Sequence, residues 1–250
     1  MHASNGEVPH WEGAVNARLL AGDIYRMGRS EWLTERGWGQ VYDDGVRTVI
    51  DLRNPAERKR RPSDPVVGDG ALARFAVVHS PTEDPGDPRY QELFQPYMNH
   101  PRLYADMVEL FPGRVAGVFK ELAAARGKVV VHCSAGRDRT GLIATLLLSL
   151  LGQAERAAAE DALAARGIND WHLVAPVKHP YERHLDRAEL ADILQGRGDA
   201  VEEFVGGMDV RAFLLANGVS DVEIDAVIAR SRTLGSHRTT DGEHTGRGVT

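Results

Sequence analysis

One ten-residue stretch of the sequence combines residue types that together can transfer a phosphate group. It runs from His132 to Gly141 and reads His-Cys-Ser-Ala-Gly-Arg-Asp-Arg-Thr-Gly. Its cysteine, Cys133, is the only cysteine in the chain, and five residues separate it from Arg139. A thiolate is a strong nucleophile, and a guanidinium presents paired donors that match two phosphate oxygens. The stretch therefore predicts attack of the cysteine on phosphorus, followed by hydrolysis of a phosphocysteine.

The residues on either side predict how this stretch is held. Residues 129–131 are a short β-branched run typical of a buried strand, and residues 142–148 are a leucine-rich run typical of a buried helix. Cys133 therefore lies on a tight turn between a strand end and a helix N-terminus. Such a turn offers unpaired N–H groups and the positive end of the helix dipole, which bind anions and favour a thiolate over a thiol. We expect Cys133 to be largely ionised at neutral pH.

The other residues of the stretch have supporting roles in this interpretation. Gly136 allows a positive φ and a close approach of the backbone to the ligand. Thr140 is expected to hydrogen-bond the sulfur of Cys133 and ease its departure as a leaving group. His132 is expected to orient the loop by hydrogen bonding to the local backbone. The residues expected to bind phosphate are Ser134, Ala135, Gly136, Arg137, Asp138 and Arg139.

This loop resembles the C-x5-R signature of the cysteine-dependent protein tyrosine phosphatases. Its HC-x-x-G-[KR]-D-R-T-G form looks like that of bacterial tyrosine/serine phosphatases that also act on phosphoinositides, in which lysine usually stands at the position of Arg137. Residues 22–26 and 46–57 resemble the opening motif of that family, although Met27 replaces its usual serine, and residues 211–224 resemble its closing helices. The resemblance spans about residues 10–232.

The resemblance implies a phosphomonoester hydrolase that acts without a metal or another cofactor. Its substrates would be phosphotyrosine and also phosphoserine, phosphothreonine or phosphoinositides, with inorganic phosphate as a ligand of the loop. Two cations in one loop, Arg137 and Arg139, suit a ligand that carries several phosphate groups. The ten histidines show no spacing typical of a metal site.

Cleavage of a phosphate ester also needs a proton for the leaving oxygen, which a carboxylic acid commonly supplies. The resemblance implies Asp138 as this acid. Asp51 is the second candidate, and its alternative role is to order the loop by accepting hydrogen bonds. Asp84 and Asp87 are the third, because the proline-rich residues 81–101 predict a long loop that could deliver either carboxyl.

Alternating strand and helix patterns predict an α/β fold, and the resemblance implies the three-layer protein tyrosine phosphatase-like arrangement, with a central, mainly parallel sheet flanked by helices. The carboxyl ends of parallel strands meet at one edge of a sheet. Asp51 and Arg53, at the end of a strand predicted over residues 47–52, should therefore share a pocket with Cys133. A second strand is predicted over residues 72–79. Helices are predicted over residues 30–36, 102–125 with a break at 112–113, 153–166, 181–195, 208–216 and 220–232.

Two of these helix ends rest on glycine. Gly167 is expected to end the helix over residues 153–166, and residues 196–198 to follow the helix over residues 181–195. Trp171 is most simply a packing residue. Trp171 and Tyr181 would flank the pocket if the segment after residue 170 capped the site, as a helical lid does in some members of the family that the loop resembles; the sequence leaves this open.

Composition sets the remaining expectations. We expect a flexible segment over residues 1–12, one phosphatase domain over residues 13–232 and a disordered tail over residues 233–250, which is almost free of apolar residues. The net charge of −6 disfavours a nucleic-acid partner. A lone cysteine excludes an intramolecular disulfide, and no apolar run resembles a signal peptide or spans a bilayer. These features favour a cytoplasmic protein and leave secretion without a signal peptide open.

Two other functions stay open beside the hydrolase. One is a phosphate-binding module without turnover, which an altered cysteine or arginine would favour. The other is a sulfur- or arsenate-transfer enzyme on a similar loop, which the absence of Arg139 and Thr140 would favour. Hydrolysis of p-nitrophenyl phosphate in the presence of EDTA separates the three.

Overall fold

Five strands form a single sheet in the computed structural model, which describes residues 8–232. Their order is β1-β2-β5-β3-β4. The β1–β2 pair is antiparallel, whereas the pairs β2–β5, β5–β3 and β3–β4 are parallel. The predicted mainly parallel sheet is therefore confirmed. The strands are β1 (Arg18–Ala21), β2 (Ile24–Met27), β3 (Val46–Asp51), β4 (Ala76–His79) and β5 (Lys128–His132).

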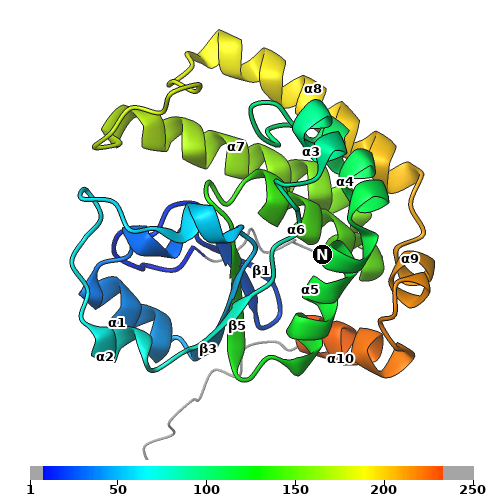
Figure 1. The fold of residues 1–250 in the computed structure, drawn as a ribbon, viewed down its shortest axis with the longest axis horizontal. Coiled ribbons are helices and arrows are strands. Elements are labelled where there is room, and N and C mark those ends of the chain that lie inside the picture. The colour runs from blue at the N-terminus through cyan, green and yellow to red at the C-terminus, as the bar shows by residue number, and fades with distance from the viewer. Residues whose placement is uncertain (1–7, 233–250) are drawn as a thin grey trace, which may run out of the picture.

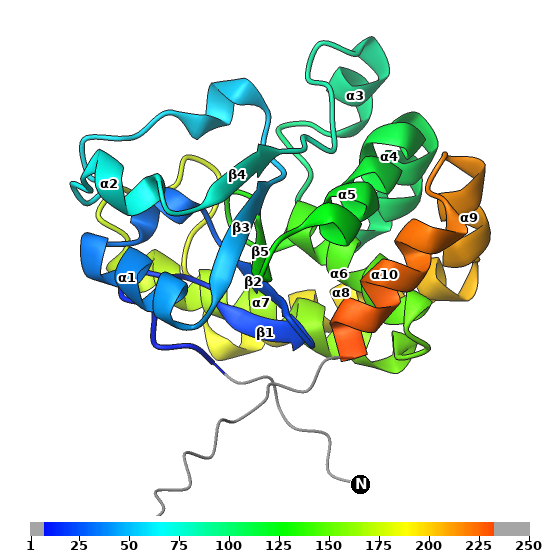
Figure 2. The same cartoon turned by 90° about the horizontal axis from the view of Figure 1, so that it is seen from below.

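Helices cover both faces of this sheet, as Figure 2 shows. On one face lie α1 (Glu35–Asp43) and α2 (Asp69–Leu72), and on the other lie α4 (Tyr104–Leu110), α5 (Pro112–Ala124), α6 (Asp138–Leu150), α9 (Val210–Ala216) and α10 (Asp221–Arg232). The long helices α7 (Ala157–Val174) and α8 (Arg187–Gly206) pack together beyond the edge of the sheet where β5 passes into α6 (Figure 1). The three-layer α/β arrangement is therefore confirmed.

The buried strands explain this layering. Successive side chains of a strand point to opposite faces, so the three valines of β5 enter two different cores. Val129 and Val131 pack in the larger core with residues of α4, α5 and α6, whereas Val130 packs in the smaller core with Trp38 and Phe75. A strand buried on both faces reads as a continuous apolar run. This burial fixes the end of β5, and hence the position of the residue that follows it.

Several predicted elements are confirmed and others are wrong in extent. The strand over residues 47–52, the strand and helix around the loop and the break before α5 agree with the structure. The helix expected over residues 30–36 is divided: residues 30–32 form a short 3-10 helix, η1 (Ser30–Trp32), and α1 begins only at Glu35. The Thr34 hydroxyl caps α1 by accepting from the Gly37 N–H at 3.0 Å. Of the strand expected over residues 72–79, only β4 (Ala76–His79) forms. Residues 81–101, expected as a loop, contain α3 (Pro88–Leu93).

The two helix ends that were predicted from glycine residues are also wrong. Helix α7 continues through Gly167 to Val174. A glycine inside a helix costs about 1 kcal/mol relative to alanine, but a Cβ at this position would lie 1.9 Å from the Asn16 Oδ1 atom. Close packing therefore requires the glycine there. Helix α8 begins after Asp186, which forms a capping box with Glu189, and it continues through residues 196–198.

Part of the segment before residue 13 packs against the rest of the protein. Residues 1–7 and 233–250, the main part of the segments expected to be flexible or disordered, lie outside the described residues. Within the described part, Trp11 is buried and its indole N–H donates to the Asp44 carboxylate at 2.7 Å. The expectation of a flexible segment up to residue 12 is therefore wrong at Trp11. In residues 8–232 no helix is long and apolar enough to cross a membrane.

Candidate active site

Cys133 lies on the turn between β5 and α6, as the sequence predicts. Strand β5 ends at His132 and α6 begins at Asp138. In the register of the sheet, His132 lies between Met27 of β2 and Asp51 of β3. The cysteine is buried, with 2% of its surface exposed. The predicted meeting of the Cys133 loop with the end of β3 is therefore confirmed.

Donors from outside the loop hold three successive loop carbonyls. A trans peptide points its C=O and its N–H in opposite directions, so each outward carbonyl turns the next N–H toward the inner side of the loop. Three inward N–H groups at the start of a helix form an anion-binding concavity. The hydrogen bonds are Arg29 N–H to Ser134 O (2.9 Å), Asn16 Nδ2 to Ala135 O (2.9 Å) and Arg26 Nη2 to Gly136 O (2.8 Å).

Gly136 has the positive φ expected of it, +66°. A Cβ at this position would lie 2.4 Å from the Met27 carbonyl oxygen and 2.6 Å from the Gly28 nitrogen. The close approach in this structure is therefore between the loop and the end of β2. Of the three outer anchors, only Arg26 lies in a motif that the sequence analysis noted, and Asn16 and Arg29 were missed. Asn16 has a positive φ of 58°, which is unusual for a residue other than glycine.

Arg139 is held by the side chains of two glutamates. Its Nη1 and Nη2 atoms donate to Glu57 at 2.6 Å each, and Nη1 also donates to Glu83 at 2.8 Å. Nη2 lies 3.3 Å from the Ser134 hydroxyl, so this side of the guanidinium faces the loop. Burial alone would lower the pKa of Arg139, but Glu83 and Glu57 raise it, and the arginine stays charged. Glu57 belongs to η2 (Pro55–Arg58), which Asn54 caps.

Asp138 accepts hydrogen bonds from two guanidinium groups. Its Oδ2 accepts from Arg137 Nε at 2.9 Å and its Oδ1 from Arg197 Nη2 at 3.0 Å. Arg197 is 2% exposed and also binds both oxygens of Asp161 on α7, at 2.7 Å each. Sequence reasoning missed Arg197 because its glycine neighbours predicted a helix end there. The proposed acid thus lies in the loop as expected, inside a buried network of ions.

Glu182, on the connection between α7 and α8, covers the other side of Arg137. The guanidinium of Arg137 donates to the two Glu182 oxygens at 2.9 and 2.8 Å. The Tyr97 hydroxyl donates to the same carboxylate at 2.6 Å, and His172 Nε2 lies 3.3 Å from it. Burial alone would raise the pKa of Glu182, but these partners, Arg137 above all, hold it at about 2.

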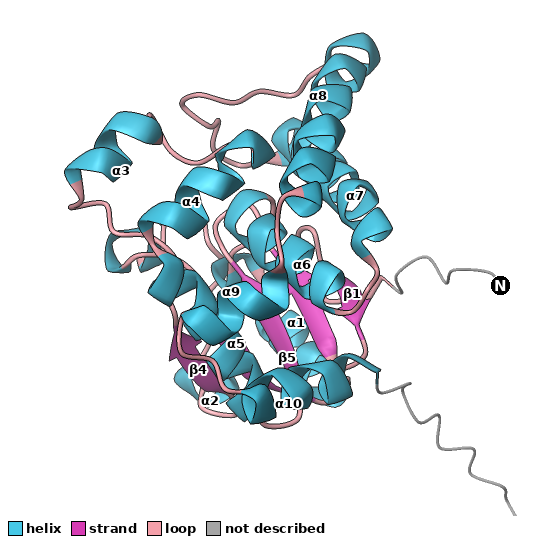
Figure 3. Ribbon diagram, turned by 90° about the vertical axis from the view of Figure 1, so that its right-hand side faces the viewer, coloured by secondary structure: helices cyan, strands magenta, loops and turns pink. Residues whose placement is uncertain are grey.

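The segment after residue 170 therefore contacts the loop through Glu182. The long connection that carries it is seen in Figure 3 between α7 and α8. Trp171 packs against Trp32, with ring centroids 4.6 Å apart and ring planes tilted by 45°, and Tyr181 is 69% exposed.

Asp51 and Arg53 form a rigid pair at the end of β3. The Arg53 backbone N–H and Nε donate to Asp51 Oδ1 at 3.0 and 2.9 Å, and Arg53 Nη2 donates to Oδ2 at 2.9 Å. Burial alone would raise the pKa of Asp51, but Arg53 and His132 hold it at about 2. His132 Nε2 lies 3.9 Å from Asp51 Oδ1, and its Nδ1 lies 3.2 Å from the Cys133 carbonyl oxygen. An ionised carboxylate suits the ordering role of Asp51 rather than proton donation.

The remaining sequence candidates take other positions. Asp84 is an exposed carboxylate that pairs with Arg114 at 2.9 Å. Asp87 accepts from two backbone N–H groups as the cap of α3. The Thr140 hydroxyl is buried and makes no hydrogen bond within the described residues, so its expected bond to the Cys133 sulfur is absent from this structure.

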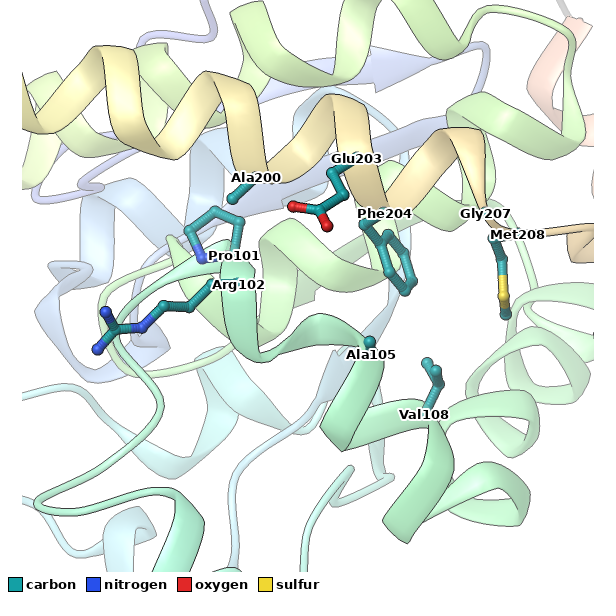
Figure 4. Close-up of a pocket in the computed structure, with 9 residues that line it drawn as sticks. All are labelled: Pro101, Arg102, Ala105, Val108, Ala200, Glu203, Phe204, Gly207 and Met208. Atoms are coloured by element: carbon teal, nitrogen blue, oxygen red, sulfur yellow. The ribbon is translucent and has the colours of Figure 1, made fainter.

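A separate groove of about 440 Å³ lies between α8 and the segment formed by η3 (Pro101–Leu103) and α4 (Figure 4). None of the residues that line it belongs to the Cys133 loop. In residues 8–232 no group of three or more histidine, cysteine or acidic side chains is arranged to hold a metal ion.

Comparison with known proteins places the chain in a family. The sequence profile of the tyrosine phosphatase family matches residues 10–232. The chain therefore belongs to the tyrosine phosphatase family, and the extent that the sequence resemblance predicted is confirmed.

Two curated relatives carry matching names. A Cupriavidus necator protein named as a tyrosine-protein phosphatase is 30% identical over 152 residues, which cover 57% of this chain and 53% of that protein. A tyrosine-protein phosphatase of Nostoc commune is 32% identical over 109 residues, which cover 43% of this chain and 36% of that protein. The chain thus spans about half of the first relative and about a third of the second.

Solved structures give weaker similarity. TpbA of P. aeruginosa, crystallised with phosphotyrosine, has 16% identity and a TM-score of 0.40, and the match covers 84% of this chain and 98% of TpbA. The catalytic domain of the S. cerevisiae PP-IP phosphatase SIW14 has 10% identity and a TM-score of 0.37, and the match covers 81% of this chain and 94% of that domain.

Proposed function

We propose that the chain is a protein-tyrosine phosphatase that hydrolyses phosphate monoesters through a phosphocysteine on Cys133. The observation that carries this proposal is the pairing of a buried cysteine at the N-terminus of α6 with Arg139, which Glu57 holds by two hydrogen bonds. The loop N–H groups and the guanidinium together supply the positive charge that a phosphate and its transition state require. Family membership supports the same reaction class.

The reaction follows from the positions of these groups. The Cys133 thiolate attacks phosphorus while the loop N–H groups and Arg139 hold the non-bridging oxygens. The bond between phosphorus and the ester oxygen breaks, and that oxygen needs a proton if it is a poor leaving group. Water then attacks the phosphocysteine and releases inorganic phosphate and the cysteine. No step in this sequence uses a metal or a cofactor.

The substrate is proposed at two levels. Phosphotyrosine is the first choice, because both curated relatives are named as tyrosine phosphatases. Phosphoserine, phosphothreonine and phosphoinositides are the wider proposal, supported by the second loop cation, Arg137. Since the guanidinium of Arg137 already pairs with Glu182 and Asp138, a second phosphate would have to displace Glu182. We also propose a cytoplasmic location, on the single cysteine and the lack of an apolar run that resembles a signal peptide. The net charge of −6 supports the proposal that nucleic acid is not a partner.

Substitution of the nucleophile tests the proposal. Cys133→Ser should abolish hydrolysis of p-nitrophenyl phosphate and of phosphotyrosine peptides, because a hydroxyl is a far poorer nucleophile at neutral pH. The variant should still bind inorganic phosphate, since the loop and Arg139 survive. Wild-type turnover should persist in EDTA. Turnover by Cys133→Ser within tenfold of wild type would refute the covalent route, and binding without turnover by the wild type would favour a phosphate-binding module.

A further inference from the structure

Glu83 is a buried acidic residue on the catalytic arginine that no sequence motif singles out. It follows β4 and η2 in the chain and is 4% exposed. Its Oε1 atom accepts from Arg139 Nη1 at 2.8 Å. The Asp84 carboxyl beside it, which the sequence favours as a mobile acid, instead pairs with Arg114 at the surface. The segment after β4 therefore brings a carboxyl to the site, but this is the carboxyl of Glu83 and not that of Asp84.

The two oxygens of Glu83 differ in their surroundings. Oε1 has its guanidinium partner, whereas Oε2 is buried and makes no hydrogen bond within normal geometry in the described residues. A buried, unpartnered oxygen is costly for an ionised carboxylate. A neutral carboxylic acid fits the arrangement, because its carbonyl oxygen accepts from Arg139 and its hydroxyl keeps a proton to donate.

The charged and titratable groups around Glu83 favour the same state. Burial is the main cause that raises the pKa of Glu83, and the neighbouring Glu57 carboxylate raises it further. The positive charge of Arg139 lowers it, and so do the side chains of Tyr90 and Asn54, which lie close enough to Glu83 for looser hydrogen bonds than the one from Arg139; these effects do not cancel the rise. Burial and Glu83 in turn raise the pKa of Tyr90, so Tyr90 stays a neutral phenol. A carboxyl with a raised pKa beside the phosphate-binding arginine is suited to general acid catalysis near neutral pH.

Other carboxyls of the site lack this combination. Glu57 uses both oxygens on Arg139, and its pKa is lowered because these hydrogen bonds outweigh burial. Asp138 uses one oxygen on Arg137 and the other on Arg197.

We propose that Glu83, rather than Asp138, gives the proton to the leaving oxygen, and this proposal rests on the phosphatase function proposed above. As Cys133 Sγ bonds to phosphorus and the ester bond breaks, the Oε2 proton passes to the departing oxygen and an alcohol or phenol leaves. Arg139 then stabilises the Glu83 carboxylate. In the second step this carboxylate takes a proton from the attacking water, the sulfur–phosphorus bond breaks, and phosphate leaves with Glu83 neutral again.

Leaving-group dependence tests the assignment. Glu83→Gln should lower kcat by about 10²–10⁴-fold on phenyl and alkyl phosphates and far less on p-nitrophenyl phosphate, since p-nitrophenolate leaves without a proton. Wild-type activity on phenyl phosphate should fall as the pH rises through the pKa of Glu83, and Glu83→Gln should lose this fall. The exposed Glu109→Gln, which carries the same chemical change in a surface pair with Arg89, should behave as the wild type.

Three results would overturn the proposal. The first is an equal loss on all substrates in Glu83→Gln, which would mean that Glu83 only positions Arg139, as Glu57 does. The second is a leaving-group effect in Asp138→Asn and not in Glu83→Gln. The third needs no variant: wild-type pH profiles that are the same for phenyl and p-nitrophenyl phosphate. Retained turnover in Cys133→Ser would instead show that the phosphatase mechanism itself is wrong, so the two failures are distinguishable.

Discussion

Replacement of Arg197 by methionine should destabilise the protein strongly, although the residue lies outside the catalytic loop. The Arg197 guanidinium donates two hydrogen bonds of 2.7 Å to Asp161, one of 3.0 Å to Asp138 and one of 2.8 Å to the Asn99 carbonyl. Asp161 is itself 2% exposed. Removal of one partner from a buried ion pair costs about 3–5 kcal/mol, because the other charge stays buried without compensation. In a chain of this size each 1 kcal/mol shifts Tm by about 2–4 °C, so we expect a fall of about 6–20 °C.

Thermal unfolding followed by circular dichroism measures this effect. Arg183→Met is the matched control, because Arg183 forms an exposed pair with Glu189 and its loss should leave Tm near that of the wild type. The double variant Arg197→Met with Asp161→Leu should recover part of the loss, since it removes the uncompensated carboxylate. An Arg197→Met variant that melts within about 2 °C of the wild type would show that the network does not stabilise the fold.

Three further predictions concern the loop and its support. Arg139→Lys should lower kcat by about 10²-fold or more, because an ammonium cannot make the paired contact to phosphate oxygens; near wild-type steady-state rates would mean that only its charge matters. Arg137→Ala should reduce kcat/KM on phosphoinositides more than on p-nitrophenyl phosphate, whereas an equal loss would show that Arg137 supports the loop. Asp51, whose folded pKa of about 2 lies below its usual 3.8, should contribute about 2 kcal/mol of stability that is present above about pH 4 and lost as the pH falls to about 2. Urea unfolding across this range should show a weaker pH dependence for Asp51→Asn, and an unchanged dependence would contradict the pairing with Arg53.

The strand, turn and helix around Cys133 could be predicted because each depends on neighbouring residues. The valine run of β5 and the leucine run of α6 are apolar, so the residues of each element alone indicate that it is buried. The turn between them needs Gly136 at a positive φ. The cap of η2 by Asn54 is local in the same way. The proposed nucleophile and the proposed phosphate-binding arginine therefore follow from ten consecutive residues.

Helix limits at glycine were not predictable, because a local penalty competes with packing that the sequence pattern does not reveal. Gly167 lowers the intrinsic stability of α7 only slightly. The Asn16 side chain occupies the space where a Cβ of residue 167 would lie, and it also donates a hydrogen bond to the Ala135 carbonyl of the loop. The same misjudgement at residues 196–198 hid Arg197, which only a continuous α8 brings to Asp138.

The carboxyl partners of Arg139 were decided by tertiary structure alone. Glu83 and Glu57 lie 56 and 82 residues from Arg139 in the chain, and the ends of β3 and β4 bring them together. Whether a carboxyl is ionised or neutral depends on its burial and on the charges around it, neither of which a residue type specifies. The sequence by itself therefore pointed to Cys133 as the proposed nucleophile and to Arg139 as the proposed phosphate-binding residue, whereas the choice among the acidic residues required the folded arrangement of distant segments.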